Sequence, residues 1–252
     1  MSNATLYHGE PNGPSLSVLA ALEESGLDIS CKPISLAAGE RHSLPGITDS
    51  TAMDFAVEGE GPVLVIDGEA MSEAVFIAQY FDEQEGGCGL QPADPYARWQ
   101  MLMWCRQTTE RLSPAAAYLG LNAATAPDFT PEAIKSDDLR MRWQDWQQGR
   151  FDEAKLADSR AKVAQFAQRI EDQLADGRAW LMGSFSIADL ETFVWIRSMR
   201  HLEAAAFSGK GALDAWLERV ESRPSVQAAL ARSVSGEPER AFAPGSEINR
   251  WG

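Results

Sequence analysis

The sequence has 252 residues, 44% of them hydrophobic, and a formal net charge of −15. This length allows one large domain or two modest ones around a substantial core. Binding to nucleic acid is not expected, because it depends on Lys and Arg neutralising phosphates. No apolar run approaches the ~18 residues of a membrane span, and residues 1–5 lack the pattern of a secretion signal. We therefore expect no membrane partner.

The three cysteines indicate a reducing compartment. Cys31, Cys88 and Cys105 are scattered, odd in number and outside any Cys-x-x-Cys or Cys/His cluster. A disulfide framework, a zinc or other metal site and a redox dithiol are therefore not expected. The default location for such a chain is cytoplasmic.

The negative charge is concentrated in the first third of the chain. Residues 1–90 contain fifteen Asp or Glu against Lys32 and Arg41, whereas residues 91–252 carry a net charge of only −2. One interpretation is a well-solvated acidic surface. The other is a face that meets a basic partner, since complementary fields steer association.

The first 60 residues indicate a β-α-β unit. Residues 4–7 are a short apolar strand, the helix runs from Ser15 to Gly26, and residues 29–36 are a second strand. Parallel strands joined in this way imply a right-handed crossover. Residues 37–60 show no clear period and are predicted to be irregular, with one short helix near residues 50–55.

The stretch from Gly61 to Phe81 predicts a strand, a tight turn, a second strand and a helix. Pro62 has no N–H for a sheet ladder and is expected at the first position of its strand. Asp67-Gly68 is a strong hairpin signal, and Ser72 or its neighbour can cap the helix. The order of elements up to this point is that of a thioredoxin-like domain.

The rest of the sequence, from residue 96 onward, is predicted to be mainly helical. Residues 96–112 and 151–174 predict long helices, the first broken at Ser113-Pro114, while residues 125–138 are loop-like. Ser186 and Asp189 have capping-box spacing before an apolar helix. The domain boundaries that we predict are 1–84 for a thioredoxin-like domain, 85–95 for a linker, 96–236 for an all-helical domain and 237–252 for a tail.

The stretch from Gly61 to Phe81 resembles the glutathione-binding half of glutathione S-transferases. In that family the proline is cis, and the residue before it pairs through its backbone with the cysteinyl unit of glutathione. The chain keeps the family residues Pro62, Leu64, Asp67, Gly68, Glu73, Ile77 and Tyr80, and departs from the pattern at Gly61 and Ala74. The Ser186–Asp189 motif resembles the helix cap of the family's C-terminal domain. The resemblance implies a thioredoxin-like α/β domain followed by an all-α domain.

A narrower resemblance is to bacterial β-etherases. It rests on residues 90–96, the long insert before Phe151 and the helix start Gly13-Pro14-Ser15-Leu16. Those enzymes cleave lignin-derived β-aryl ethers with glutathione as nucleophile, so an aromatic small-molecule substrate is implied. Five aromatic side chains in the helical half suit either a phenolic substrate or core packing: Trp99, Trp104, Tyr118, Trp143 and Trp146.

The resemblance also implies site residues. Ser15 is the candidate donor to the glutathione thiolate, with Asn12 nearby, although a serine after proline is also an ordinary helix cap. Glutathione would further meet Gly61, Pro62, Ser72 and Glu73, with Arg41 and His42 for its glycyl carboxylate. Ala74 cannot supply the hydroxyl that holds the γ-glutamyl carboxylate.

Two functions stay open at this point. One is a glutathione-dependent etherase that forms a dimer with itself or with a related transferase subunit. The other is a structural or regulatory subunit of a heterodimer, with a degenerate glutathione site and no catalysis of its own.

Overall fold

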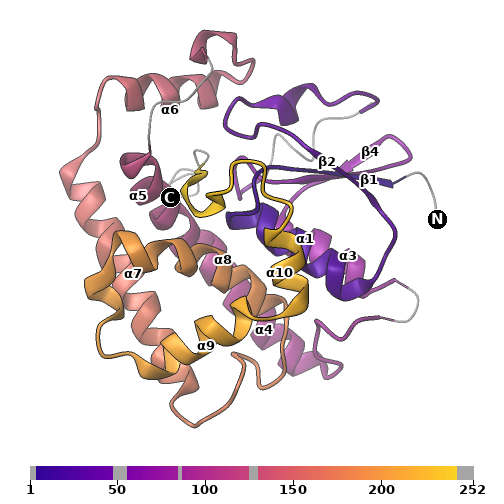
Figure 1. The fold of residues 1–252 in the computed structure, drawn as a ribbon, viewed down its shortest axis with the longest axis vertical. Helices are drawn as coiled ribbons and strands as arrows, with labels where there is room; N and C mark the ends of the chain where they lie inside the picture. Colours follow the sequence, from indigo (N-terminus) through magenta and orange to yellow (C-terminus); the bar gives the residue numbers. More distant parts are fainter. Residues whose placement is uncertain (1–3, 48–55, 85–86, 125–129, 243–252) are drawn as a thin grey trace.

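A computed structural model describes residues 4–47, 56–84, 87–124 and 130–242. It places a small sheet on one side and a cluster of helices on the other, with the last described residues running between the two (Figure 1). The sheet has the order β2-β1-β3-β4, and its strands are β1 (Ala4–His8), β2 (Ser30–Pro33), β3 (Val63–Ile66) and β4 (Glu69–Met71). β1 pairs in parallel with β2 and antiparallel with β3. The predicted β-α-β unit and hairpin are therefore confirmed.

The turns form where local chemistry requires them. Asp67 and Gly68 have φ values of 52° and 92° between β3 and β4, as a two-residue hairpin with positive φ at both positions requires. α1 (Gly13–Ser25) ends at Gly26, whose φ is 64°. α1 begins two residues before the predicted Ser15, because Pro14 fits the first turn of a helix without needing an N–H partner.

The peptide bond before Pro62 differs from the expectation. The resemblance implied a cis bond, but among the described residues no peptide bond is cis. The chain enters β3 through a tight turn in which the Gly61 N–H donates to the Gly59 carbonyl at 2.9 Å. Gly61 has no Cβ, and the Glu58 carboxylate lies against the space that a Cβ would fill. The backbone at Gly61 therefore passes directly beside the buried Glu58 carboxylate.

From residue 95 onward the described residues are mainly helical. After α3 (Ala74–Asp82), the helices are α4 (Pro95–Gln107), α5 (Ser113–Ala123), α6 (Asp137–Gln147), α7 (Glu153–Leu174), α8 (Ile187–Leu202), α9 (Gly211–Glu221) and α10 (Pro224–Leu230). The predicted break at Ser113-Pro114 is milder than expected, since one turn of π-helix over Thr108–Leu112 joins α4 to α5. The boundaries at residues 84 and 95 stay a prediction.

α6 is a helix that the sequence analysis missed, because it assigned residues 125–138 to a loop and left those that follow unassigned. Ser136 caps it by accepting the Leu139 N–H. The Trp143 indole N–H then donates to the Ala37 carbonyl at 2.7 Å, which fixes α6 against the irregular segment of the first domain. The short helix predicted near residues 50–55 lies outside the described residues.

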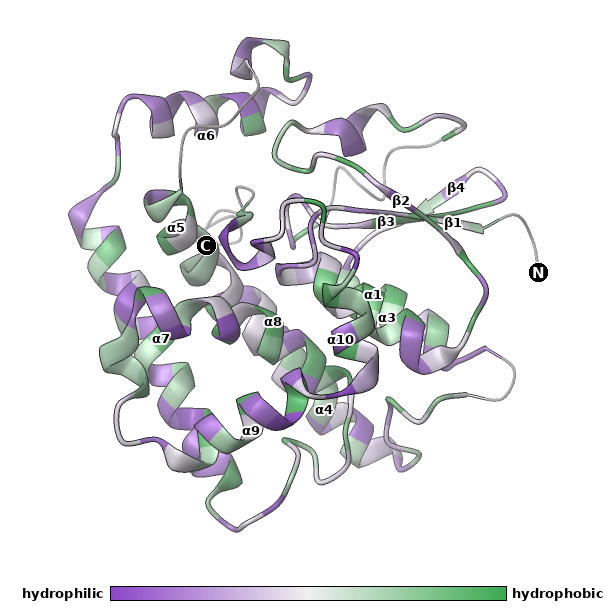
Figure 2. Cartoon of the chain, viewed as in Figure 1, coloured by the Kyte–Doolittle hydropathy of each residue, from purple (hydrophilic) through white to green (hydrophobic). Residues whose placement is uncertain are grey.

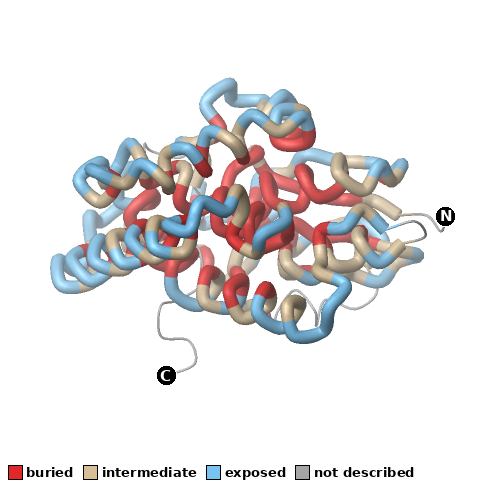
Figure 3. Tube along the Cα trace, turned by 90° about the horizontal axis from the view of Figure 1, so that it is seen from below, coloured by how far each residue is buried: buried red, intermediate tan, exposed pale blue. Residues whose placement is uncertain are grey.

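The core runs through both halves. α1 is apolar along most of its length (Figure 2) and packs against α3, α8 and α10. Buried residues gather at the centre of the molecule, and exposed ones lie along the outer faces of the peripheral helices (Figure 3). No helix within the described ranges is both long and apolar enough to cross a membrane. The two halves share one core, and α1 lies within it between them.

α8 starts at a buried cap that the sequence predicted. The capping box of Ser186 and Asp189 is present, and the Ser186 N–H donates to Asp189 Oδ2 at 3.0 Å. Asp189 is fully buried and also accepts from the Leu181 N–H and the Trp216 indole, both at 2.9 Å. This carboxylate therefore joins the loop before α8 to α9.

Candidate active site

A cavity of about 150 Å³ lies between the two domains at the start of α1. Asn12, Gly13 and Pro14 form one wall, and Trp195 of α8 and Phe242 of the tail form another. Gly13 has a φ of 50°, and a Cβ there would lie 3.3 Å from the Trp195 ring. Glycine therefore permits the close approach of the α1 start to Trp195.

The two candidate catalytic residues both lie at this end of α1. Ser15 is buried, and its Oγ accepts the Gly9 N–H at 3.0 Å. Asn12 lines the cavity and bridges the domains, because its Oδ1 accepts from the Ser198 hydroxyl at 2.8 Å and its Nδ2 donates to the Ala241 carbonyl at 3.3 Å. Ser15 thus supports the cavity wall formed by Gly9, but it is not itself among the residues that line the cavity.

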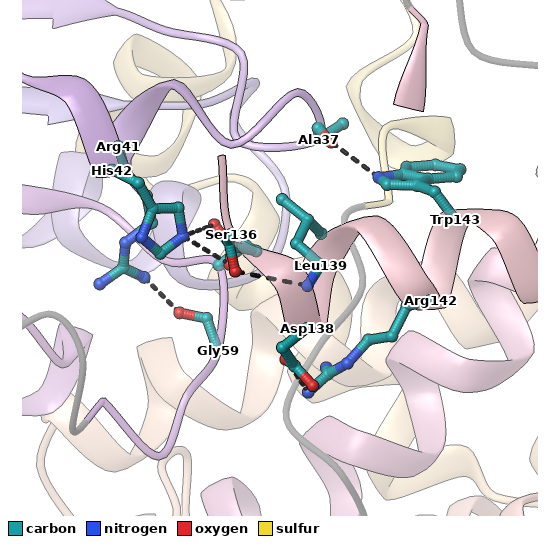
Figure 4. A network of polar contacts seen from close by, with 10 residues as sticks. Ala37, Arg41, His42, Gly59, Ser136, Asp138, Leu139, Arg142 and Trp143 are labelled. Carbon is teal, nitrogen blue, oxygen red and sulfur yellow. Dashed lines mark hydrogen bonds and ion pairs between the residues drawn. The ribbon is translucent and has the colours of Figure 1, made fainter. Parts of the chain in front are cut away.

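Arg41 and His42 lie together on a short 3₁₀ turn over Glu40–Ser43 (Figure 4). Arg41 is buried and donates to the Gly59 carbonyl, whereas His42 Nε2 lies 3.0 Å from a Glu60 carboxylate oxygen. Both residues thus contact the segment that leads to Pro62, while Arg41 Nε and Nη2 have no hydrogen-bond partner among the described residues.

Glu73 and Ser72 lie at the start of α3. Glu73 is the N-cap residue and has a φ of 71°, which is rare for a residue with a side chain. Its Oε1 accepts the Glu58 N–H at 3.0 Å. Ala74, the first residue of the helix, donates its N–H to Glu58 Oε2 at 2.8 Å. The structure thus brings Glu58, which the sequence did not single out, to the position next to Ala74.

Three carboxylates share this buried region. Burial raises the pKa of the Glu58 carboxyl well above its usual range, and the charges of Glu191 and Glu73 act in the same direction. Burial likewise raises the pKa of Glu191 to about 7. Arg41 is the positive charge that acts on Glu58 in the opposite direction. Burial therefore favours the neutral, protonated forms of the Glu58 and Glu191 carboxyls.

The comparisons with known proteins agree with this architecture. Residues 138–233 match the family model described as the glutathione S-transferase C-terminal domain. Protein LigF of Sphingobium sp. strain SYK-6 is 24% identical over 90% of this chain and 93% of its own length. The crystal structure of that β-etherase superposes with a TM-score of 0.77 at 23% identity, over 92% of this chain and all of the other. The chain has the two-domain glutathione S-transferase fold.

A further solved transferase extends the comparison. The theta class glutathione S-transferase from Xanthomonas axonopodis pv. citri, with glutathione bound, has a TM-score of 0.66 at 18% identity, covering 93% of this chain and all of its own. The expected combination of a thioredoxin-like domain with a helical domain is thereby confirmed. In this fold the cavity at the start of α1 lies where the two domains meet.

The aromatic residues that line the cavity are not the five that the sequence analysis named as candidates for substrate binding. The lining contains Trp195 and Phe242 and none of Trp99, Trp104, Tyr118, Trp143 or Trp146. Trp104 is buried in the core, with its indole donating to Thr192 at 2.8 Å. A signal for Trp195 was available, since it follows the Ser186–Asp189 cap by two helical turns. Phe242 is an aromatic residue in a tail without periodicity, which suggested an anchor for the tail and not a cavity wall. For Glu58 the sequence held no comparable signal.

Proposed function

We propose that the chain is a glutathione-dependent transferase of the β-etherase type, which cleaves aryl ether bonds of lignin-derived aromatics in the cytoplasm. The observation that carries this proposal is the interdomain cavity at the start of α1, walled by Trp195 and Phe242. A helix N-terminus favours an anion such as a thiolate, and aromatic walls suit an aryl group. The likeness to the β-etherase LigF supports the choice of reaction.

The reaction is a displacement at carbon. Glutathione gives its thiol proton to solvent, and the thiolate attacks the carbon that bears the aryloxy group. A carbon–sulfur bond forms as the carbon–oxygen bond breaks, and the phenolate leaves with the electron pair and takes a proton from water. In this proposal the Ser15 hydroxyl donates to the thiolate while its oxygen keeps the Gly9 N–H, and Asn12 holds the cavity wall.

Turnover of a β-aryl ether that carries a fluorescent phenol tests this function. Phenol release is expected only with glutathione present. Ser15→Ala should lower kcat/KM by about 10- to 100-fold, the range for one hydrogen bond to a charged group. Ser159→Ala is the matched control, because Ser159 is equally buried but lies on α7. Equal activity of the Ser15 and Ser159 variants would remove Ser15 from the mechanism.

A second candidate function is the structural or regulatory subunit of a heterodimer. It is favoured by the contacts of Arg41 and His42, which bind Gly59 and Glu60 within the protein. The turnover assay separates the two functions. Phenol release by the purified chain alone supports the enzyme, whereas release only after a related transferase chain is added supports the subunit.

We further propose that the chain dimerises through an aromatic face on α3 and α4. Phe76, Tyr96 and Trp99 are 59%, 66% and 52% exposed, and the Tyr96 and Trp99 rings stack with centroids 5.4 Å apart. A shallow groove of about 570 Å³ runs beside Phe76 and Tyr80. Exposed apolar surface of this kind marks protein interfaces, and a second copy offers an identical face in a twofold dimer.

Loss of the aromatic face should give a monomer. The double variant Phe76→Ala, Trp99→Ala is expected to elute at half the mass of the wild type in size-exclusion chromatography with light scattering. Met141→Ala removes an equally exposed apolar side chain from α6 and serves as the control. An unchanged mass for the double variant, or a wild-type monomer, would contradict this interface.

A further inference from the structure

The tail that follows α10 forms one side of the interdomain cavity, and its residues 233–242 are called the strap below. The strap is fastened at its start by Glu10, whose Oε1 accepts the N–H groups of Val234 and Ser235, both at 3.0 Å. Glu10 Oε2 also accepts the hydroxyls of Ser233 at 2.7 Å and Ser235 at 3.1 Å. One carboxylate of the loop before α1 therefore holds the start of the strap.

The end of the strap is held by a second side chain of the same loop. Asn12 Nδ2 donates to the Ala241 carbonyl at 3.3 Å, while Asn12 Oδ1 accepts from the Ser198 hydroxyl of α8 at 2.8 Å. A short 3₁₀ turn over Pro238–Arg240 connects the two ends. Because the strap is bonded at both ends, it places Phe242 against the cavity, which Phe242 lines.

The Phe242 ring lies directly on the backbone of α5 at Gly120. A Cβ on Gly120 would overlap this ring, with Phe242 Cγ only 2.5 Å away and two further ring atoms closer still. Phe242 lines the cavity and Gly120 does not, so the ring lies between α5 and the cavity. Any larger residue at position 120 would therefore push the ring toward the cavity.

The backbone of α5 gives no other reason for a glycine at this position. Gly120 lies inside the helix, and its φ is not positive. Glycine is also among the least favourable residues in a helix interior, and alanine is the most favourable. The contact with the Phe242 ring is thus the feature of this position that requires a residue without a side chain.

The space that remains in front of the ring is small. The cavity encloses about 150 Å³, and an apolar cavity of about this volume holds one benzene molecule. Trp195 of α8 lines the same cavity, and it lies close to the start of α1, since a Cβ on Gly13 would be 3.3 Å from its ring. Neither wall has space to spare, so a small shift of Phe242 should change which ligands fit.

We propose that Gly120 is a positioning residue of the aryl site: it seats the Phe242 ring on α5, and this seat determines how large an aryl group the cavity accepts beside Trp195. This inference rests on the proposed function, because that function places the aryl group of the ether in this cavity. The ligand class is a single neutral phenol ring with small substituents.

The rest of the lining agrees with a neutral ring. Ile34 and Leu36 supply apolar surface, and Glu10 and Glu60 are the lining residues whose carboxylates have partners on the page: Glu10 holds the strap, and Glu60 lies 3.0 Å from His42 Nε2. A phenol with a pKa of about 10, like that of tyrosine, is uncharged near neutral pH. It would therefore bring no anion to these carboxylates.

Calorimetry with phenol and 2-methoxyphenol, without glutathione, tests the inference. The wild type should bind both. Gly120→Ala should weaken the binding of 2-methoxyphenol by about tenfold or more and that of phenol by under about threefold, because one extra group in a filled pocket is discriminated by about this much. The variant should fold, since alanine is the better helix former.

A compensating variant separates the seat of the ring from other effects on α5. In the double variant Gly120→Ala, Phe242→Leu, the smaller leucine leaves room for the added methyl group, so 2-methoxyphenol should return to within about threefold of its wild-type affinity. Gly211→Ala is the matched control, because this helix glycine has nothing within 4 Å of an added Cβ, and it should change neither affinity. Glu10→Ala frees the start of the strap and should weaken both phenols by a similar factor.

Three results would overturn this inference: a Gly120→Ala variant that binds both phenols like Gly211→Ala, a folded double variant without recovery, or a wild type that binds neither phenol. If Gly120→Ala does not fold, Phe242→Leu alone decides, since it should shift the preference toward 2-methoxyphenol, and an unchanged preference counts against the seat. The expected binding pattern without any thioether formation removes the proposed reaction and leaves this inference standing. Turnover with an unaffected Gly120→Ala variant does the reverse.

Discussion

Replacement of Asp189 by alanine is expected to lower the free energy of unfolding by about 4 kcal/mol or more. The Asp189 carboxylate is fully buried and accepts four hydrogen bonds: two from the N–H and hydroxyl of Ser186, and one each from the Leu181 N–H and the Trp216 indole. Alanine would leave all four donors buried without a partner. Each such donor costs about 1–3 kcal/mol.

Urea unfolding of Asp189→Ala measures this loss. Asp189→Asn tests the same point with a side chain of equal shape, because its NH₂ group would face donors and should also destabilise the fold. Asp138→Ala is the control: Asp138 is an exposed aspartate near the start of α6 that pairs with Arg142, and its loss should cost under about 1 kcal/mol. A loss below about 1 kcal/mol for Asp189→Ala would contradict the role assigned to the cap.

The stability of the protein is expected to fall as the pH rises from about 5 to about 8. Burial raises the pKa of Glu191 from 4.5 to about 7, so the folded state keeps a proton that the unfolded chain has lost. The stabilisation from this group is full below pH 4.5 and disappears as the pH rises through about 7, a change of about 3 kcal/mol. The raised pKa of Glu58 acts in the same direction.

Glu191→Gln removes this titration while keeping the side-chain shape. The variant should be more stable than the wild type at about pH 8, and its stability should depend less steeply on pH. Glu110→Gln is a suitable control, because the Glu110 side chain is half exposed and forms an ion pair with Arg106, four residues earlier in the chain. The interpretation of Glu191 as a buried, neutral carboxyl would be contradicted by either of two results. One is a wild-type stability that rises with pH over this range, and the other is a Glu191→Gln variant whose stability depends on pH as steeply as that of the wild type.

The features predicted correctly depend on local chemistry. The Asp67-Gly68 turn, the Gly26 helix end and the Ser186–Asp189 cap each involve residues close in sequence, and the structure has all three. α6 was missed because its residues are largely polar and give little hydrophobic periodicity. The signal that could have found it is Ser136 followed by two aspartates, since a capping serine and acidic residues mark a helix start.

The site was harder to predict because it joins distant segments. Trp195 meets Gly13 across the domain interface, and Glu58 reaches Ala74 over 16 positions. The sequence identified Gly61 and Ala74 as departures from the family pattern but offered no cause. In the structure both residues lie beside Glu58, since its Oε2 accepts the Ala74 N–H and lies 2.8 Å from where a Cβ on Gly61 would be. Local pattern and propensity do not locate such a contact.

The measurement that tests the central claim most directly is the identification of the products formed by the purified chain from glutathione and a β-aryl ether. Mass spectrometry should find one glutathione thioether for each phenol released, with sulfur on the carbon that carried the aryloxy group. Phenol released without a thioether, or no turnover at saturating glutathione with or without a related transferase chain, would contradict the assignment of the interdomain cavity as a thiol-transfer site.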